Sequence, residues 1–332
     1  MPNELNVSII ILNWNGKKDT LECLNSVTKI NYKKLSIIIA DNGSTDDSVL
    51  EIRNRYPNLT MVENGANLGF AEGNNHAISY ALNHGADAVV ILNNDTIVHK
   101  NLIQSFIDAY QSLDRVGILG ATCFYYDNPE VIWTCGANFD NDSLHFNYLH
   151  QGLKASDTPE EKLTPVDYIV GCVMFVPKEV INSAGLMDKT YFLNFEEFDW
   201  CNKIRESGYT NYTVKDAMIW HKISSSFGGK NSPLKNYFLT RNFFLWIKRY
   251  HPELLPKLFI KSMLELNPPL TIDINDKHIF KSIFWSVIKW PSICKKHFTS
   301  PQFISQAYGI YHYLTKRFDD CPEKLKQRLT KP

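Results

Sequence analysis

Residues 7–16, VSIIILNWNG, form an apolar run rich in isoleucine that ends in asparagine, tryptophan and glycine. Such a run predicts a strand buried on both faces of a parallel sheet, followed by a turn. Three similar runs follow at 35–40, 60–63 and 88–92, and stretches with helical spacing separate them. This βαβαβαβ order is typical of a doubly wound, Rossmann-like sheet, in which ligands bind at the carboxyl ends of the strands.

The chain beyond these runs is less regular. Residues 117–168 are rich in aromatic and turn residues, which favours antiparallel strands and loops. Residues 170–177, VGCVMFVP, predict another buried strand, and the acidic segment 194–200 leads into a helix. Ser44 or Thr45 is placed to cap the helix that follows the second strand.

The composition is that of a globular protein. Of the 332 residues, 44% are hydrophobic and 13% aromatic, which excludes disordered and fibrous chains. The 35 basic and 35 acidic residues give no net charge, which argues against nucleic acid as a partner. Neither a run of about 18 apolar residues nor a signal peptide is seen. The seven cysteines never form a C-x-x-C pair, so we expect reduced thiols in a cytoplasmic protein.

Charge is unevenly distributed along the chain. From Pro233 onward there are 17 basic and 7 acidic residues, which leaves 18 basic and 28 acidic residues before it. This asymmetry predicts two functional regions, of which the basic one faces an anionic partner. The alternative is a solvated helical surface.

Polar clusters stand where four of the predicted strands end: Asn13 with Asn15, Asp41, Asn67 with Gly69, and Asn93 with Asn94 and Asp95. Because the carboxyl ends of parallel strands meet at one edge of the sheet, these groups would line a single crevice. The Asp41 carboxylate could accept a hydrogen bond from the imide of uracil or thymine, and Gly69 would let the backbone approach a ligand. The alternative is ordinary turn chemistry.

The cluster at 93–95 offers oxygen ligands for a hard divalent cation, such as Mg²⁺ or Mn²⁺. His221 follows an apolar run at 217–220 and could supply a nitrogen ligand that Mn²⁺ accepts. A lone histidine is more often a structural residue, so the interpretation depends on the other ligands.

Glu196, Glu197 and Asp199 place three carboxylates beside aromatic residues. Desolvation and the neighbouring negative charges both raise the pKa of such a carboxyl group, which suits a general base. Acidic residues are also common in the first turn of a helix, so both interpretations can hold.

In order along the chain, VSIIILNWNG, IIIADNGSTDDS, NGANLGFAEGNN and LNNDT resemble the donor half of glycosyltransferase family 2, the inverting enzymes with the GT-A fold. GCVMFVPK, FEEFDWCNKIRESGY, IWHK and YFLTRN resemble the acceptor half of its bacterial rhamnosyltransferase-like branch. The resemblance covers about residues 5–250. It implies an α/β GT-A fold, with a Rossmann-like mixed sheet and a helical C-terminal extension.

The resemblance also implies a domain plan. Residues 1–232 would form the catalytic domain, with a nucleotide-sugar-binding half at 1–100 and an acceptor half at 101–232. Residues 233–332 would form a basic, aromatic helical region.

A role for each matching residue follows from the resemblance. The donor nucleotide would contact Asn13, Asn15, Asp41, Asn67, Gly69, Asn94 and Arg241. The acceptor would contact Glu196, Asp199, Gly171 and Trp200. The metal, Mn²⁺ or Mg²⁺, would be held by Asp95, His221 and Asn93. Glu197 would be the catalytic base, which takes the proton of an acceptor hydroxyl as that oxygen displaces the nucleotide diphosphate with inversion.

The branch resemblance favours dTDP-L-rhamnose as the donor, with a UDP-hexose as the alternative. The acceptor would be a saccharide or a polyprenyl-diphosphate-linked oligosaccharide of bacterial surface polysaccharide synthesis. Two other enzyme classes are disfavoured because their motifs are absent near the first strand. A nucleotidyltransferase would have a Gly-rich basic loop there, and an oxidoreductase would have G-x-G-x-x-G. A non-catalytic nucleotide-sugar-binding protein stays open.

Residues 279–296 interleave aromatic residues with lysines. Such a helix can lie among lipid headgroups, where Trp and Lys act as anchors, which would place the protein on the inner face of the bacterial cell membrane. The alternative is a helix packed on the catalytic domain, or a contact between subunits of an oligomer.

Overall fold

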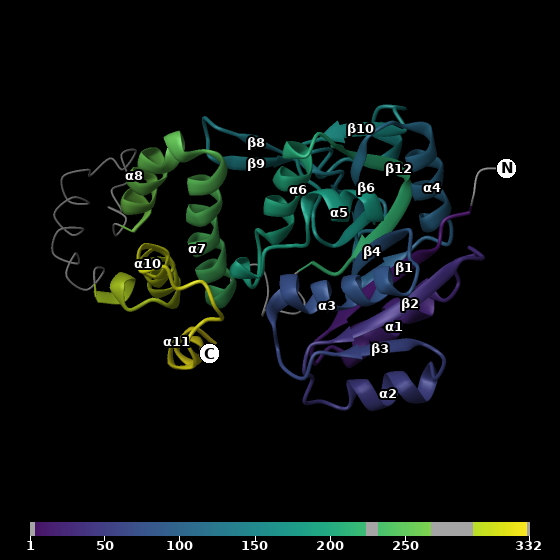
Figure 1. Cartoon of the computed structure of the whole chain (residues 1–332). Coiled ribbons are helices and arrows are strands. Elements are labelled where there is room, and N and C mark those ends of the chain that lie inside the picture. Colours follow the sequence, from purple (N-terminus) through teal and green to yellow (C-terminus); the bar gives the residue numbers. More distant parts are fainter. Residues whose placement is uncertain (1–3, 224–231, 267–294, 331–332) are drawn as a thin grey trace. The chain divides into compact units, whose positions relative to one another are not determined.

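The computed structural model describes residues 4–223, 232–266 and 295–330. The chain divides into two compact units, Met1–Lys230 and Asn231–Pro332. We call them the α/β unit and the helical unit, and Figure 1 labels most of the helices and strands of both. Each unit is described by itself.

The α/β unit is built on one ten-stranded sheet and a separate two-stranded sheet. The first part of the large sheet consists of β1 (Val7–Asn13), β2 (Leu35–Asp41), β3 (Thr60–Glu63), β4 (Ala88–Asn93) and β5 (Thr96–Val98). The second part consists of β6 (Val116–Tyr125), β7 (Ile132–Thr134), β10 (Leu163–Val166), β11 (Val173–Pro177) and β12 (Thr210–His221). The small sheet is the hairpin of β8 (Ala137–Asp140) and β9 (His145–Tyr148).

The strands of the large sheet follow the order β10-β12-β6-β11-β4-β1-β2-β3, with β5 on β12 and β7 on β6. The four strands β1 to β4 are mutually parallel, β11 is antiparallel to both β4 and β6, and β12 is parallel to β6. Because two reversals restore the direction, β6 and β12 run the same way as β1. Their carboxyl ends therefore reach the edge that holds Asn13, Asp41 and Asn93, which we call the strand-end edge.

The four apolar runs of the first hundred residues form strands within one residue of the expected bounds, and the mixed sheet confirms the predicted fold class. The segment 117–168 differs from expectation at its start, because Val116–Tyr125 is a long inner strand with a parallel partner in β12. This strand contains Gly117 and Gly120, and glycines in a sequence usually indicate a turn. A Cβ on Gly120 would come 2.7 Å from the Ile169 side chain, so this glycine serves close packing.

The helices of the α/β unit are α1 (Lys17–Val27), α2 (Ser48–Arg55), α3 (Gly69–Asn83), α4 (Leu102–Ser112), α5 (Lys178–Ala184) and α6 (Glu196–Glu206), with 3-10 turns η1 (Ala155–Asp157) and η2 (Lys189–Tyr191). The apolar faces of α1, α2 and α4 pack on one core with β1, β4 and β6. The expected cap of α2 by Ser44 or Thr45 is wrong: α2 begins at Ser48 without a side-chain cap. The Ser44 hydroxyl donates to Asp41 instead.

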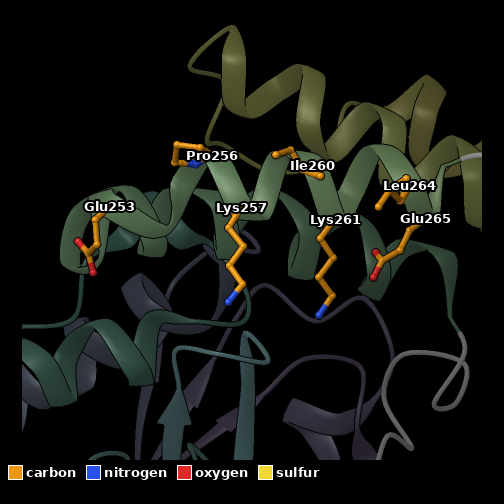
Figure 2. A pocket seen from close by; sticks show the side chains of 7 residues that line it. All are labelled: Glu253, Pro256, Lys257, Ile260, Lys261, Leu264 and Glu265. Atoms are coloured by element: carbon orange, nitrogen blue, oxygen red, sulfur yellow. The ribbon is translucent and has the colours of Figure 1, made fainter.

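The helical unit contains α7 (Pro233–Tyr250), the 3-10 turn η4 (Pro252–Leu254), α8 (Leu255–Glu265), α10 (Pro301–Leu314) and α11 (Glu323–Thr330). A shallow surface pocket runs along α8 (Figure 2). Its lining residues are Glu253, Pro256, Lys257, Ile260, Lys261, Leu264 and Glu265. Among the described residues, we find no helix with both the length and the apolar character to cross a membrane.

Candidate active site

Asp95 lies in the short turn between β4 and β5, and His221 is the last residue of β12. The strand β5 runs back from this turn and pairs with the end of β12, so that Thr96 stands opposite His221. This pairing brings Asp95 Oδ1 to 3.0 Å from His221 Nε2, and both residues are buried. Local strand pairing therefore joins two residues that are far apart in the sequence.

A pair of ligand atoms at this spacing suits a hard divalent cation. Mg²⁺ binds six ligands at about 2.1 Å, and neighbouring corners of such an octahedron stand about 3.0 Å apart. The distance from Asp95 Oδ1 to His221 Nε2 has this value. In the described ranges no cluster of three or more His, Cys, Asp or Glu residues forms a metal site. A cation here would therefore complete its shell from substrate oxygens or from Asn93, which is half-buried at the end of β4.

Asn13 and Asp41 stand opposite each other at the ends of β1 and β2, and both are buried. The Asn13 amide donates to Asp41 Oδ1 at 2.8 Å and to the hydroxyl of Ser48 at 2.9 Å. Ser44 donates both its backbone N–H and its hydroxyl to the Asp41 carboxylate, at 3.0 and 2.6 Å. A carboxylate has about four lone-pair sites. Three are used here, two on Oδ1 and one on Oδ2, so Asp41 is a fixed acceptor with one site of Oδ2 left for a further donor.

The other asparagines of the donor set are also ordered by neighbouring loops. Asn15 has a left-handed φ of 50°, and its Oδ1 accepts backbone N–H groups of the loop after β2. Asn67 Oδ1 accepts from the Asn42 amide and from the Gly69 N–H. Asn94 donates to a threonine hydroxyl of α1. The strand-end edge thus carries a connected polar network, while the contacts of these residues with a donor stay predictions.

Backbone strain is concentrated just before the acidic residues of α6. Phe192, Asn194 and Phe195 have left-handed φ angles of 60°, 64° and 77°, which non-glycine residues rarely adopt. Each such residue costs about 1–3 kcal/mol and persists only where the surrounding structure enforces it. This strained turn places Glu196 and Glu197 at the start of the helix. Strain of this kind is typical of functional sites.

The two glutamates have different surroundings. Glu196 is buried, whereas Glu197 is partly exposed. Burial and the nearby Glu197 charge raise the pKa of Glu196 well above its ordinary value of 4.5, although backbone N–H groups of Glu196 and Asn194 act in the opposite direction. The expectation of a raised carboxyl pKa is therefore met by Glu196.

Glu197 lies close to the segment that borders the metal-binding pair. A Cβ on Gly171 would stand 3.5 Å from the Cβ of Glu197, an ordinary van der Waals contact, so the two residues are direct neighbours. The next residue, Cys172, accepts the backbone N–H of Asn93 at 3.0 Å and lies within electrostatic range of Asp95. The segment 171–172 therefore connects the acidic turn with the end of β4.

Two residues of the predicted acceptor set lie in the interior. Asp199 is fully buried and accepts a hydrogen bond from the Tyr191 hydroxyl at 3.1 Å. Trp200 is also fully buried, and its indole N–H donates to the carbonyl of Gly185. A side chain in such a position reaches an acceptor only if the structure around it opens. Their acceptor role stays a prediction, and their described contacts support the fold of α6.

Arg241 belongs to the helical unit, where it is fully buried on α7. Its guanidinium donates to the carbonyl oxygen of Asp319 and to the side-chain oxygen of Asn242. It also lies over the rings of Tyr237 and Phe238. These contacts all lie within one unit, and a contact of Arg241 with the donor diphosphate stays a prediction.

The structure brings three residues to the site that the sequence did not single out. Lys222, next to His221, bonds to Asp19 and Glu22 of α1. Although partial burial opposes it, these bonds raise the pKa of Lys222. Trp133 and Tyr148 are the other two, and Trp133 packs 4.9 Å from the His221 ring. Lys222 could have been found from the sequence, because it directly follows His221 in the IWHK motif. The two aromatic residues lie in a segment without any recognisable motif.

Comparison with known sequences decides the family. The family model described as "Glycosyl transferase family 2" matches residues 8–175, just over half of the chain. The chain belongs to glycosyltransferase family 2. Its sheet and helical C-terminal region are those of the GT-A fold expected for this family.

Two relatives place this family 2 chain in the rhamnosyltransferase-like branch. One is the dTDP-rhamnosyl transferase RfbF of Shigella flexneri, 24% identical over 266 residues, which are 75% of this chain and 82% of that protein. The other is the N-acetylglucosaminyl-diphospho-decaprenol L-rhamnosyltransferase of Mycobacterium tuberculosis, 25% identical over 227 residues, which are 62% of this chain and 72% of that protein.

A solved structure shares the fold of this family 2 chain. It is the mannosyltransferase PcManGT from Pyrobaculum calidifontis in complex with GDP-Man and Mn²⁺. The TM-score is 0.54 at 14% sequence identity, over 95% of this chain and 89% of that chain. At this identity the likeness speaks for the fold alone.

Proposed function

We propose that this protein is an inverting, metal-dependent hexosyltransferase that moves a sugar from a nucleotide diphosphate to a hydroxyl of a saccharide acceptor. The observation that carries the proposal is the grouping of the Asp95–His221 pair with Glu197 around the segment 171–172. A ligand pair for a cation and a carboxylate base are the two groups that a direct displacement needs.

Glu197 is the base of this reaction. Unlike buried Glu196, Glu197 is partly exposed, so an acceptor hydroxyl can approach it. Its charge is one of the causes that raise the pKa of Glu196. As the acceptor oxygen forms its bond to the anomeric carbon, the bond from that carbon to the diphosphate oxygen breaks. The hydroxyl proton passes to the Glu197 carboxylate, and the bonding electrons leave with the nucleotide diphosphate. One displacement inverts the configuration.

Asp95 and His221 are the residues that would hold the cation, which would be Mn²⁺ or Mg²⁺. A divalent cation, when bound, stabilises the negative charge that develops on the departing diphosphate. The protein contributes a preformed ligand pair, since strand pairing fixes both residues before any substrate binds. Lys222 supports this arrangement by tying the chain after His221 to α1.

The donor that we favour is dTDP-L-rhamnose. The names of both relatives include a rhamnosyl activity, and one of them names the dTDP donor. The fixed Asp41 carboxylate suits the imide N–H of thymine, and equally that of uracil, so a UDP-hexose is the alternative. A thermal-shift panel of dTDP- and UDP-sugars with Mg²⁺ separates the two, because a ligand that binds only the folded state raises the melting temperature.

The acceptor that we favour is a saccharide on a polyprenyl diphosphate, which would bring the protein to the inner face of the cell membrane. The name of the mycobacterial relative contains such a lipid diphosphate. In the helical unit, Ile260 and Leu264 of α8 are 63% and 67% exposed, and Lys257 and Lys261 project from the adjoining face (Figure 2). Apolar and basic side chains together suit an anionic headgroup layer.

The segment 279–294, which carries most of the predicted membrane contact, lies outside the described residues. Of its continuation, Lys295 and Lys296 are exposed. Flotation with anionic vesicles at low salt tests the contact. The double reversal Lys257→Glu/Lys261→Glu should weaken binding, while Lys29→Glu/Lys33→Glu on the α/β unit should not. Equal binding of all three proteins would exclude α8 from the contact.

The experiment that tests the function replaces Glu197 by Gln. The variant should lose at least about 10³-fold in transfer rate, because the proton acceptor is gone, and should still bind the nucleotide sugar. The control is Glu206→Gln, an exposed glutamate at the other end of α6. Near-normal transfer by Glu197→Gln would refute the base. Product of retained anomeric configuration would refute the single displacement.

A further inference from the structure

Two aromatic side chains of the acceptor half, Trp133 and Tyr148, form a pair that no step of the proposed transfer employs. Their ring centroids are 6.5 Å apart and their planes differ by 26°. Backbone hydrogen bonds keep the rings adjacent: the N–H of Cys135 donates to the carbonyl of Leu149, and the N–H of Leu149 donates to that of Gly136. We call this pair the aromatic wall.

One end of the aromatic wall touches the metal-binding pair. The ring of Trp133 has its centroid 4.9 Å from that of His221, with the planes tilted by 39°. His221 Nε2 in turn lies 3.0 Å from Asp95. A group that rests on Trp133 is therefore beside the place where the donor diphosphate would be bound.

The other end of the aromatic wall lies beside the acidic turn. Phe146 is on the same face of β9 as Tyr148, two residues away, and stacks on Phe198 of α6 at 4.3 Å. This contact sets β9 against the first turn of the helix that carries Glu197. Burial raises the pKa of Tyr148 to about 12, and the negative charge of Glu197 contributes to the increase. Tyr148 and Glu197 therefore lie within range of an electrostatic interaction.

The aromatic wall has two polar groups at its rim, the indole N–H of Trp133 and the hydroxyl of Tyr148. Among the described residues, neither the indole N–H of Trp133 nor the hydroxyl of Tyr148 forms a hydrogen bond with a protein group. Both side chains are half-buried. Aromatic residues with a polar end that are only packing the core usually bond that end to a protein group. An apolar face with a free donor at its rim is what binding sites for amphipathic ligands offer.

We propose that the aromatic wall is the acceptor subsite, on which a pyranose ring of the acceptor saccharide stacks and presents its hydroxyl to Glu197. A pyranose has an apolar face of C–H groups and a polar rim of hydroxyls, so it matches a ring face flanked by an N–H and an O–H. The inference rests on the proposed function, because the stacked sugar is the nucleophile of that transfer.

The position of the wall favours the acceptor over the donor. The donor network of Asn13 and Asp41 lies at the ends of β1 and β2, on one side of the metal-binding pair. The wall comes from β7 and β9 and lies beside β12 and α6, on the side of the base. A sugar on the wall would thus stand between His221 and Glu197.

The test uses the full chain labelled with ¹⁵N and follows the indole N–H signals by NMR in the presence of dTDP and Mg²⁺. The signal of Trp133 is assigned by its absence from Trp133→Phe. The probes are the methyl glycosides of rhamnose, glucose, galactose and N-acetylglucosamine. At least one should shift the Trp133 signal in a saturable manner. The signals of Trp200 and Trp220, whose indoles donate to Gly185 and Pro129, should stay in place.

Two variants separate a sugar platform from a packing role. Trp133→Phe keeps an aromatic face and should bind the responding glycoside within about threefold of the wild type, measured on the ligand signals. Trp133→Leu keeps apolar volume without a face and should bind it about tenfold more weakly, which corresponds to the upper range for one ring stack. Tyr148→Phe should also weaken binding by a few fold through the lost hydroxyl.

The results distinguish the two proposals. A saturable shift of the Trp133 signal with the expected ranking of the variants supports the subsite. If, in addition, no nucleotide sugar raises the melting temperature, the proposed function fails and the subsite stands. If dTDP-sugars bind but no methyl glycoside shifts the Trp133 signal, the subsite is overturned and the function stands. Equal affinities of the Leu and Phe variants would also overturn it.

Discussion

The carboxylate of Asp95 and the imidazole of His221 meet at 3.0 Å because β5 folds back from the turn after β4 and pairs with the end of β12. The pairing of the two strands places the two residues side by side, so their ligand groups come together as part of the fold. A preformed pair avoids the ordering of ligands during binding and keeps the reorganisation in the reaction small.

Replacing Asp95 by Asn should therefore disable the reaction without unfolding the protein. The side chain keeps its size but loses the charge that would hold a divalent cation. We expect the transfer rate to fall by about 10²-fold or more. The Mg²⁺-dependent part of the thermal shift by a nucleotide sugar should also disappear. The matched control is Asp216→Asn, an exposed position on the strand that ends in His221. A full metal response in Asp95→Asn would remove this residue from the cation site.

Asp41 has a structural task as well as the proposed binding task. Its carboxylate accepts from the Asn13 amide and twice from Ser44, all at a buried strand end. In Asp41→Asn an NH₂ group replaces one carboxylate oxygen. This NH₂ group faces donors of Asn13 or Ser44, so at least one of those donors loses its acceptor. We expect the free energy of unfolding to fall by about 1–3 kcal/mol. Urea denaturation measures this change.

Donor binding provides the second measurement on Asp41→Asn. The variant stays almost fully folded in buffer, so the stability loss by itself would hardly change the affinity for dTDP-sugars. If Asp41 accepts the imide N–H of the base, that affinity should nevertheless fall clearly. The comparison variant is Ser48→Ala, which removes another hydrogen bond of Asn13 but no acceptor for the base. Equal donor affinities of the two variants would leave Asp41 with the structural task alone.

Glu196 predicts a pH dependence of stability. Its pKa is raised in the folded protein, so the folded state holds a proton that the unfolded chain releases above about pH 4.5. Unfolding therefore becomes easier as the pH rises from that value through the folded pKa. Gln imitates the protonated carboxyl group and removes this effect. At neutral pH, Glu196→Gln should be more stable than the wild type by about 1 kcal/mol or more, since a tenfold change in proton affinity between the folded and unfolded states corresponds to about 1.4 kcal/mol.

The stability gain of Glu196→Gln should shrink as the pH falls toward 4.5, where the wild-type carboxyl group is protonated in both states. Thermal unfolding across this range checks it, with the exposed Glu206→Gln as the control. A gain that is independent of pH, or a loss at neutral pH, would contradict the raised pKa.

The sequence allowed the donor half to be predicted because its information is local. Short β-branched runs with polar ends define parallel strands, and parallel strands place their ends together. The acceptor half was predicted less well. Its long strand β6 contains Gly117 and Gly120, which indicate a turn in the sequence but here admit Asn211 and Ile169 at close range. Only the packed structure shows such a contact.

The candidate site divides in the same way. Asp95 and Glu197 stand in recognisable motifs, so their types and positions were predicted. The aromatic wall was not, because Trp133 and Tyr148 come together through a hairpin and a backbone bond between Cys135 and Leu149. Nothing in the spacing of two aromatic residues marks them as neighbours. The same holds for Asp199, whose acidic character suggested a ligand contact and whose place is the interior.

Gly69 links the donor loop to the strained acidic turn. It has a φ of 78°, and a Cβ there would stand 2.2 Å from the carbonyl oxygen of Phe192. That carbonyl accepts the N–H of Phe70 at 2.7 Å. Gly69→Ala must therefore push the two segments apart, and we expect it to lower the free energy of unfolding by about 2 kcal/mol or more, through the left-handed backbone and the overlap together.

Gly65→Ala is the matched control for this link. Gly65 has a similar φ of 73°, but nothing lies within 4 Å of a Cβ there, so the variant carries the backbone cost without the overlap. We expect a loss of about 1 kcal/mol for it. The excess loss in Gly69→Ala then measures the contact with Phe192. Because the turn at 192–195 presents Glu197, transfer should fall in Gly69→Ala and stay near normal in Gly65→Ala. Equal loss of stability and of transfer in both variants would show that the contact with Phe192 does not couple the two segments.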